Sequence, residues 1–506
     1  MLITKKNIMK QVKTLMVLIM ILFCANVTLH AQQNKKENLS VLYVGYDPAV
    51  PVDEKIIDSP TATGGMTPER FKEDVKTRFN AFESYLKEYF TTVKAVDARS
   101  YTMDMSKKYD VTIFDQTITP WEKEQRSPYK QAKFLTEDFD FPTIFIGHTA
   151  PQMGGSIGLK LDWLCLCLDA DAHHLKSEHP IFKGPFPVTL TMVVKPTPAD
   201  IYHYPSGKDV PKEIPMWRVQ KEGYMEGKGY RIGLVARGDG FSDSPDAEYI
   251  SSGVNSKDVG AVAIGRHGNF LLWGFSASPD FMTDEAKQVF ANTVVYIKKF
   301  KGQKPIARKY NDRIGTKSIV DEMIAKLNTE SFEEFKVYMG EMNIVREKSI
   351  NELLAKKEKG ETLTELEEAI LGAQSQPIPI PTWEQYLQQT AQTFFKPEYV
   401  KNVDKLKKYL KENRKYMYSD PKGFFDLKVD EDVKKLGVDN EDVKLLQRSI
   451  TLLKSGKDTD LAKRVLLRYT GMEKSPQEWE KWLNENSSKL FFTEAGGYKW
   501  MIDTTK

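Results

Sequence analysis

The chain has 506 residues, of which 41% are hydrophobic and 11% aromatic, enough to fill more than one packed core. Its 73 basic and 70 acidic residues leave a formal charge of +3, so no broad basic surface attracts nucleic acid or an anionic membrane. We therefore expect a globular protein whose partners are neither nucleic acid nor membrane.

The first 31 residues have the features of an export signal. Four lysines precede the apolar run LMVLIMILFCANVTL, and small Ala31 stands at a cleavage position before Gln32. The apolar run is shorter than the roughly 20 residues that a membrane-spanning helix needs. We predict a signal peptide over residues 1–31 and a mature protein that is periplasmic or secreted, with no membrane attachment.

From residue 39 to residue 302 the pattern predicts an α/β domain. Short β-branched runs such as LSVLYVGY, VTIFDQT and PTIFIGH alternate with helical patterns, of which residues 68–90 are the longest. This alternation favours a parallel sheet with helices on its faces. GAVAIGRHGNFLLWGF predicts two strands around a turn at Gly268, and Thr283 is a suitable N-cap for the helix that follows.

Beyond residue 302 the strand patterns give way to helical ones. The connecting stretch KGQKPIARKYNDR is polar and short of apolar anchors, as expected of a domain boundary. Residues 316–375 predict a helical segment, SQPIPIPTW interrupts it with alternating prolines, and residues 383–506 predict a second helical domain. This all-α C-terminal region has no His or Cys, so we expect it to bind a protein partner or to act as a scaffold.

Residues 164–180, LCLCLDADAHHLKSEHP, combine cysteine, aspartate and histidine in one stretch. On an extended backbone alternate side chains share a face, so Cys165, Cys167, Asp169, Asp171 and His173 would all point the same way. One interpretation is a metal-binding or acid-base face. The other has both cysteines buried as small hydrophobic residues and the aspartates at a solvated strand end. With both cysteines that remain after removal of the signal peptide in one C-x-C, no disulfide framework is expected.

Two further histidines lie near this stretch in the sequence. His148 follows a buried strand, where ligands bind in open α/β sheets, and Pro180 restricts His179 to an extended conformation. The candidate catalytic residues are His148, Asp171, His173 and His179. The candidate ligands of a divalent metal are Asp169 and His174. A buried, hydrogen-bonded structural role is the alternative for each histidine.

The order of these strands, the glycine-bearing loop after His148, the motif EHPIFKGP and the closing WGF strand-helix pair resemble a known family. They are similar to the trehalose-utilisation (ThuA-like) branch of the class I glutamine amidotransferase-like superfamily, over about residues 39–300. The resemblance implies a flavodoxin-like three-layer α/β/α sandwich and a link to carbohydrate metabolism. Glutamine amidotransfer is not expected, because His148 and Thr149 follow IFIG where amidotransferases place a nucleophilic cysteine.

Two functions remain open from the sequence. The first is an exported enzyme that acts on a sugar or sugar derivative through a His/Asp-lined cleft. The second is a non-catalytic module on the same fold that binds a glycan, another small molecule or a protein. The enzyme requires His148, His173 and His179 around one pocket, with carboxylates in reach.

Overall fold

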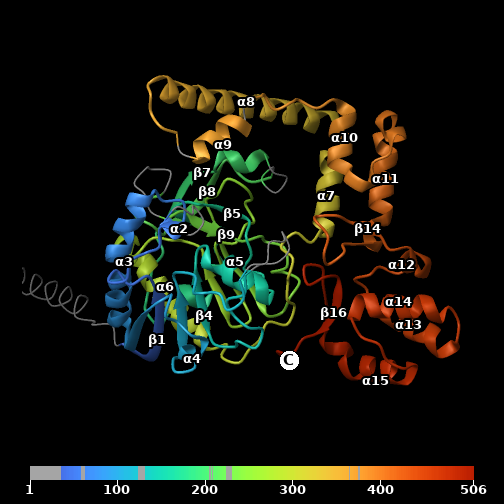
Figure 1. Ribbon diagram of the computed structural model, residues 1–506. Coiled ribbons are helices and arrows are strands. Elements are labelled where there is room, and N and C mark those ends of the chain that lie inside the picture. The colour runs from blue at the N-terminus through green and yellow to red at the C-terminus, as the bar shows by residue number, and fades with distance from the viewer. Residues whose placement is uncertain are drawn as a thin grey trace, which may run out of the picture.

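The computed structural model describes residues 36–57, 63–123, 132–203, 207, 209–223, 231–363, 365–373 and 376–506. Within them the chain forms an α/β part and a mainly helical C-terminal part, which lie side by side (Figure 1). The predicted signal peptide lies outside the described residues, so it stays a prediction.

A large mixed sheet organises the α/β part. Across the described residues it has ten strands in the order β2-β1-β3-β4-β12-β11-β10-β6-β8-β7. Five neighbours are parallel: β2 (Phe90–Asp97), β1 (Glu37–Gly45), β3 (Val111–Phe114), β4 (Thr143–Ile146) and β12 (Phe270–Trp273). The others pair antiparallel: β11 (Ile264–His267), β10 (Ala247–Gly253), β6 (Asp171–His173), β8 (Glu213–Arg218) and β7 (Met192–Pro196).

The predicted parallel sheet is therefore right for one half of the sheet and wrong for the other. The chain reverses at the β11–β12 hairpin, where Gly268 has a φ of 59°. A turn of two residues can join only antiparallel strands, because a parallel crossover needs a dozen or more residues. The hairpin that the sequence predicts around Gly268 is confirmed.

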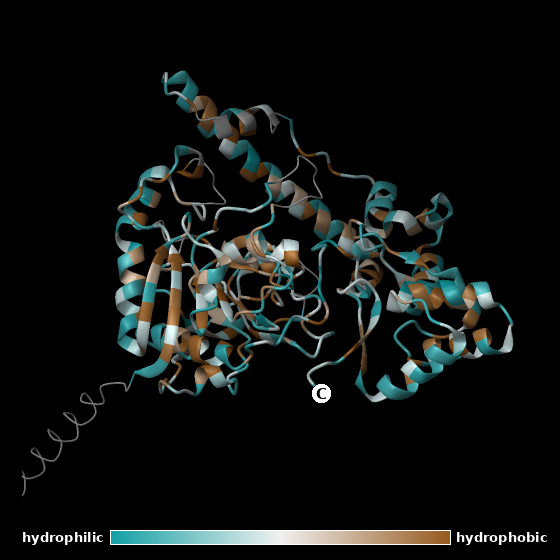
Figure 2. Ribbon diagram, turned by 60° about the horizontal axis from the view of Figure 1, so that its bottom comes forward, coloured by the Kyte–Doolittle hydropathy of each residue, from teal (hydrophilic) through white to brown (hydrophobic). Residues whose placement is uncertain are grey.

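Helices cover both faces of the parallel half. Alternate residues of β1 point to opposite faces: Tyr43 stacks on Phe82 of α3 (Pro68–Tyr89), whose ring lies near that of Phe290 in α6 (Asp284–Lys298). Leu42 belongs to a second core with Met153 of α5 (Thr149–Gly154). Figure 2 shows hydrophobic residues along the strands of the sheet and also on helices. Helices on the faces of the sheet are what the alternation of strands and helices predicts.

The helix predicted over residues 68–90 is confirmed as α3. It begins at Pro68, a favoured first residue, after Thr67 accepts a hydrogen bond from the Arg70 amide. Its buried side carries the expected aromatic residues at helical spacing and also one charged residue, Arg78. The predicted N-cap of α6 is confirmed as well, since Thr283 accepts a hydrogen bond from the Ala286 amide.

The connection between the two parts is held more firmly than its polar sequence predicts. Ala307 and Lys309 are buried, and Lys309 Nζ lies 2.6 Å from a carboxylate oxygen of Asp162. The Ile306 amide also donates to Asp246 over 2.7 Å. The sequence offers few apolar residues to hold this connection in place. A buried ion pair and a backbone hydrogen bond to a buried carboxylate hold it instead.

The C-terminal part is mainly, but not wholly, helical. Its helices in the described residues are α7 (Lys317–Lys326), α8 (Thr329–Glu358), α9 (Glu365–Ala373), α10 (Trp383–Ala391), α11 (Val403–Asn413), α12 (Glu431–Leu436), α13 (Lys444–Ser455), α14 (Thr459–Thr470) and α15 (Pro476–Asn486). Two small hairpins correct the all-α prediction: β13 (Met417–Tyr418) with β14 (Lys428–Val429), and β15 (Leu490–Thr493) with β16 (Lys499–Ile502). The proline-rich interruption ends at Thr382, which caps α10 in a capping box with Gln385.

Candidate functional site

The stretch that looked like one polar strand is divided between two sheets. Cys165–Leu168 forms β5, which pairs with β9 (Gly233–Val235), whereas Asp171–His173 forms β6 of the large sheet. The alternation of side chains therefore stops at Asp169 and Ala170, which belong to neither strand. The prediction of a single polar face from Cys165 to His173 is wrong, because a change of sheet resets which side each residue faces.

Cys165 and Cys167 form a disulfide with each other. Cys167 is buried and Cys165 is partly buried, in agreement with the packed position expected for them. A bond between the two cysteines themselves was not predicted. The bond spans two positions of the sequence, so it closes a very small loop and does not cross-link distant parts of the fold.

Asp171 is held by two cations of neighbouring strands. Its carboxylate oxygens lie 2.7 Å from Lys195 Nζ and 2.9 Å from Arg218 Nη1. Arg218 stands opposite Asp171 in the β6–β8 pairing, and Lys195 comes from β7 beyond it. Two direct ion pairs fix the Asp171 carboxylate between neighbouring strands, so this geometry favours a structural role.

His173 and His174 contact each other but no other predicted site residue. Their Nδ1 atoms are 2.7 Å apart, so one imidazole donates and the other accepts. His173 is fully buried, and burial lowers its pKa to about 3, whereas His174 is exposed. The expectation that His173 emerges towards a cleft is wrong, since β6 lies between β10 and β8 in the sheet interior. Asp169 lies against Gly223, and its amide donates to Val254.

His179 belongs to a separate hydrogen-bonded group. Its Nε2 lies 3.5 Å from Glu248 Oε2, and its ring packs edge-on against Tyr296 at 4.7 Å. Arg266 Nε and the Tyr296 hydroxyl donate to the same carboxylate over 2.8 and 2.6 Å. Burial alone would raise the pKa of Glu248, but these hydrogen bonds hold it well below its usual range.

The position of Glu248 shows how far His179 lies from His173. Glu248 is four residues along β10 from Ser252, the residue that pairs with His173. At about 3.3 Å per residue this separates the two sites by roughly 13 Å along the strand. His173 and His179 therefore do not converge on one reactive atom.

His148 lies at the carboxyl end of β4, as expected. The preceding Gly147 has a φ of 54°, and a Cβ there would lie 2.4 Å from Ser276 Oγ, so only glycine makes this sharp turn into α5. His148 is buried, and its Nε2 has no hydrogen-bond partner among the described residues. Burial and the nearby Arg231 guanidinium lower the pKa of His148 to about 3.

A buried cluster of charges lies beside His148 and was not predicted. The guanidinium of Arg78 donates to both carboxylate oxygens of Asp115, each over 2.7 Å, and the Tyr43 hydroxyl donates to Asp115 over 2.8 Å. Arg231 lies 3.6 Å from Asp115 and donates to Asp74 over 2.9 Å. We call Arg78, Asp115, Arg231 and Asp74 the arginine–aspartate cluster. Two positive and two negative charges balance within it.

The cluster lies where the strand order reverses. In the sheet, β2 lies on one side of β1 and β3 lies on the other. Asp115 directly follows β3. Burial would raise the pKa of Asp115, but Arg78 and Arg231 outweigh it and lower that pKa to about 2. Two signals in the sequence pointed here: an aspartate directly after a buried strand, and an arginine on the apolar side of α3.

The described residues offer no ready metal site. Within them, no three or more His, Cys, Asp or Glu side chains are arranged to hold a metal ion. Asp169 and His174, the predicted ligands, take part in different contacts. The proposal of a divalent metal at these two residues therefore has no geometric support.

A cavity of about 610 Å³ lies between α7, α8 and α10 of the C-terminal part and Tyr202 of the α/β part. We call it the interdomain cavity. Phe335, Tyr338 and Tyr386 contribute further aromatic rings to its lining. Sites for small molecules commonly have this size, about 300–1,000 Å³, and commonly lie between domains.

Polar groups complete the lining of the interdomain cavity. Glu322, Glu334 and Glu341 supply carboxylates, Lys326 supplies an amine, and Gln389 supplies an amide. Burial raises the pKa of Glu322 above its usual value. The helical part was expected to bind or scaffold, but its aromatic residues were not assigned to a cavity. Their helical spacing is equally typical of core residues, and only the fold brings Tyr202 beside them.

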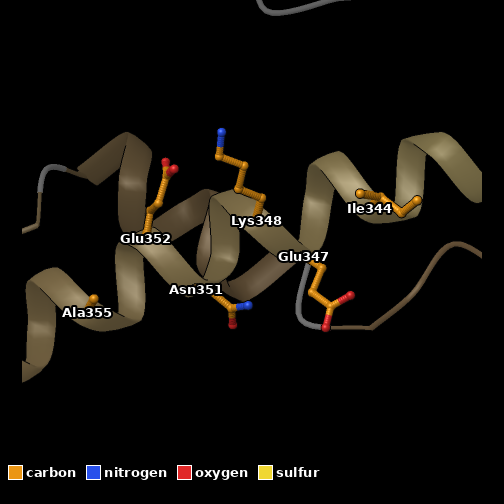
Figure 3. A pocket seen from close by; sticks show the side chains of 6 residues that line it. All are labelled: Ile344, Glu347, Lys348, Asn351, Glu352 and Ala355. Atoms are coloured by element: carbon orange, nitrogen blue, oxygen red, sulfur yellow. The ribbon is translucent and has the colours of Figure 1, made fainter.

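A second hollow, of about 500 Å³, involves only α8. Figure 3 shows that Ile344, Glu347, Lys348, Asn351, Glu352 and Ala355 all come from this helix. Their side chains point in different directions rather than towards one centre. This hollow is the open surface of one helix and not an enclosed ligand site.

Among the described residues, no helix is both long and apolar enough to cross a membrane. Comparisons of the chain with known protein families, with curated proteins and with solved structures return no match. Functional inference therefore depends on the geometry of the sites described above.

Proposed function

We propose that this is an exported binding protein that takes a sugar or sugar derivative in the interdomain cavity. The observation that supports it best is one cavity of about 610 Å³ that combines aromatic rings with carboxylates and an amide. Aromatic faces pack on the apolar face of a sugar ring, while carboxylate and amide groups exchange hydrogen bonds with its hydroxyls. Four aromatic rings line the cavity, from Tyr202, Phe335, Tyr338 and Tyr386.

The charges of the cavity favour one kind of sugar. Three glutamates and one lysine line it, so its net charge is negative. The negative charge of the cavity repels an acidic sugar and attracts the protonated amine of an amino sugar. It neither repels nor attracts a neutral sugar. We infer a neutral or amino sugar as the ligand.

The proposed relationship to ThuA-like proteins agrees with this ligand class. The parallel half of the sheet, with helices on both faces, is compatible with a flavodoxin-like sandwich. A ThuA-like origin would connect the protein with carbohydrate metabolism. We propose this origin on the sequence motifs, with the sheet as support.

A catalytic role for the predicted His/Asp cleft has less support. The pKa values of His148 and His173 are lowered to about 3, far below the value that suits a general base near neutral pH. His148 lies near the arginine–aspartate cluster, whereas His173 contacts His174 and His179 contacts Glu248, so the three histidines do not line one cleft. Binding without catalysis is therefore the function that the geometry supports best.

The test is sugar binding by the mature protein and two matched variants. We expect isothermal titration calorimetry with a panel of neutral, amino and acidic mono- and disaccharides to detect a neutral or amino sugar. Gln389→Ala should weaken binding about fivefold, because it removes one hydrogen-bonding group worth about 1 kcal/mol. Gln388→Ala is the control, since this exposed neighbour on α10 does not line the cavity. The proposal fails if no sugar binds, or if both variants bind alike.

Export is the second part of the proposal. The C-x-C disulfide supports an oxidising compartment, because disulfides persist in the periplasm and outside the cell. We expect the intact mass of the protein purified from its native host to correspond to a chain that begins at Gln32, with the Cys165–Cys167 bond formed. A mass that includes residues 1–31, in the membrane fraction, would contradict export as a free protein.

A further inference from the structure

The helix α8 exposes an unusual number of large aliphatic side chains. Val337, Ile344 and Val345 are 62%, 69% and 61% exposed, although their neighbours on the opposite side, Ile350 and Leu353, are buried. Figure 1 shows α8 along the outer boundary of the molecule, with no other element above it. Exposed apolar residues that gather on one side of a helix mark an interaction surface more often than scattered ones do.

This surface also carries two charges of opposite sign. Glu341 and Lys348 recur with Val337 and Ile344 at spacings of three and four residues, so all four share one side of α8. The salt bridges of α8 in the described residues involve other side chains, such as Lys336 with Glu333. We call Val337, Glu341, Ile344, Val345 and Lys348 the α8 stripe. Val337 and Glu341 also line the interdomain cavity, so the stripe continues from the cavity along α8.

We propose that the α8 stripe binds the α8 stripe of a second copy of this chain, in antiparallel orientation. When Ile344 of one copy lies opposite Val345 of the other, Glu341 lies opposite Lys348, and the symmetry repeats both contacts. A two-fold interface requires this kind of self-complementary surface. The aliphatic residues form the centre of the contact, and the two ion pairs flank it.

The same charges exclude a parallel pairing. In a parallel pair in register, Glu341 would face Glu341 and Lys348 would face Lys348, so both contacts would be repulsive. Glu341 and Lys348 are seven residues apart, which is about 10 Å along a helix. The contact is therefore small, and we expect a dimer that dissociates in the micromolar range rather than an obligate one.

Charge reversal tests the partner and its orientation together. Sedimentation of the mature protein should show a concentration-dependent dimer. Glu341→Lys and Lys348→Glu should each weaken dimerisation at least about tenfold, because each variant puts like charges together at both symmetric contacts. An equimolar mixture of the two variants should dimerise again, since every contact between them is then attractive.

Two controls separate this effect from damage to the fold. Lys357→Glu makes the same charge change at an exposed position on the other side of α8, so it should leave dimerisation unchanged. Helix content and melting temperature should be alike in all variants, because Glu and Lys are similarly good helix formers. A protein that stays monomeric at millimolar concentration, or a mixture that stays monomeric, would overturn the proposal.

Discussion

Lowering the pH from 7 to 5 should destabilise the folded protein by about 4 kcal/mol through His148 and His173 alone. Both imidazoles are buried, and burial lowers the pKa of each to about 3 from an ordinary value of 6.5. Burial lowers the pKa of His267 in the same direction. A loss of this size is comparable with the whole stability of many domains, about 5–15 kcal/mol.

The sign follows from which state binds the protons. Because the folded pKa is below the unfolded one, each histidine's contribution is complete above pH 6.5 and is lost as the pH falls towards 3. At pH 5 the unfolded chain protonates both imidazoles while the folded chain leaves them neutral. This difference is worth about 2 kcal/mol for each histidine.

Urea unfolding at pH 7 and at pH 5 measures the effect. His173→Gln removes the titrating group, so it should reduce the loss of stability between these pH values by about 2 kcal/mol, whatever it does to stability at pH 7. Between pH 7 and pH 8.5 the variant and the wild type should show the same pH dependence. If the wild type and the variant lose equal stability on acidification, His173 is not held neutral in the fold.

Local patterns in the sequence predicted those elements that have a local cause. The aromatic spacing of α3, the N-cap Thr283 and the turn at Gly268 are all confirmed, because each depends on residues within a few positions of one another. The parallel half of the sheet followed from the alternation of strands and helices. The antiparallel half did not, because the pattern of a strand does not show in which direction the strand pairs with its neighbour.

The candidate site was predicted less well because its geometry depends on distant partners. An alternating pattern cannot show that the chain leaves one sheet at Leu168 and joins another at Asp171. Arg78 meets Asp115 across 37 positions and Arg231 meets Asp115 across 116, and no spacing rule connects them. The sequence signals were Asp115 directly after a buried strand and Arg78 on the apolar side of a helix, and neither shows which residue is the partner of the other.

The arginine–aspartate cluster leads to the other large expected effect. Asp115→Asn should destabilise the protein by about 3–5 kcal/mol at pH 7, because it leaves Arg78 and Arg231 buried beside a neutral amide. Urea unfolding measures this loss. Glu73→Gln is the matched control on α3: its ion pair with Lys76 is exposed, so its loss should lie within the error of the measurement.

Acid titration gives the same substitution a second readout. The pKa of Asp115 is lowered to about 2 from 3.8, so its contribution is complete above pH 3.8 and is lost as the pH falls towards 2. The wild type should therefore lose about 2 kcal/mol more than Asp115→Asn over this window. Equal losses, or an Asp115→Asn variant as stable as Glu73→Gln, would contradict a structural role. If an Asp115→Asn variant of unchanged stability failed to bind sugar, we would infer that the ligand binds at the carboxyl ends of β1 and β3 and not in the interdomain cavity.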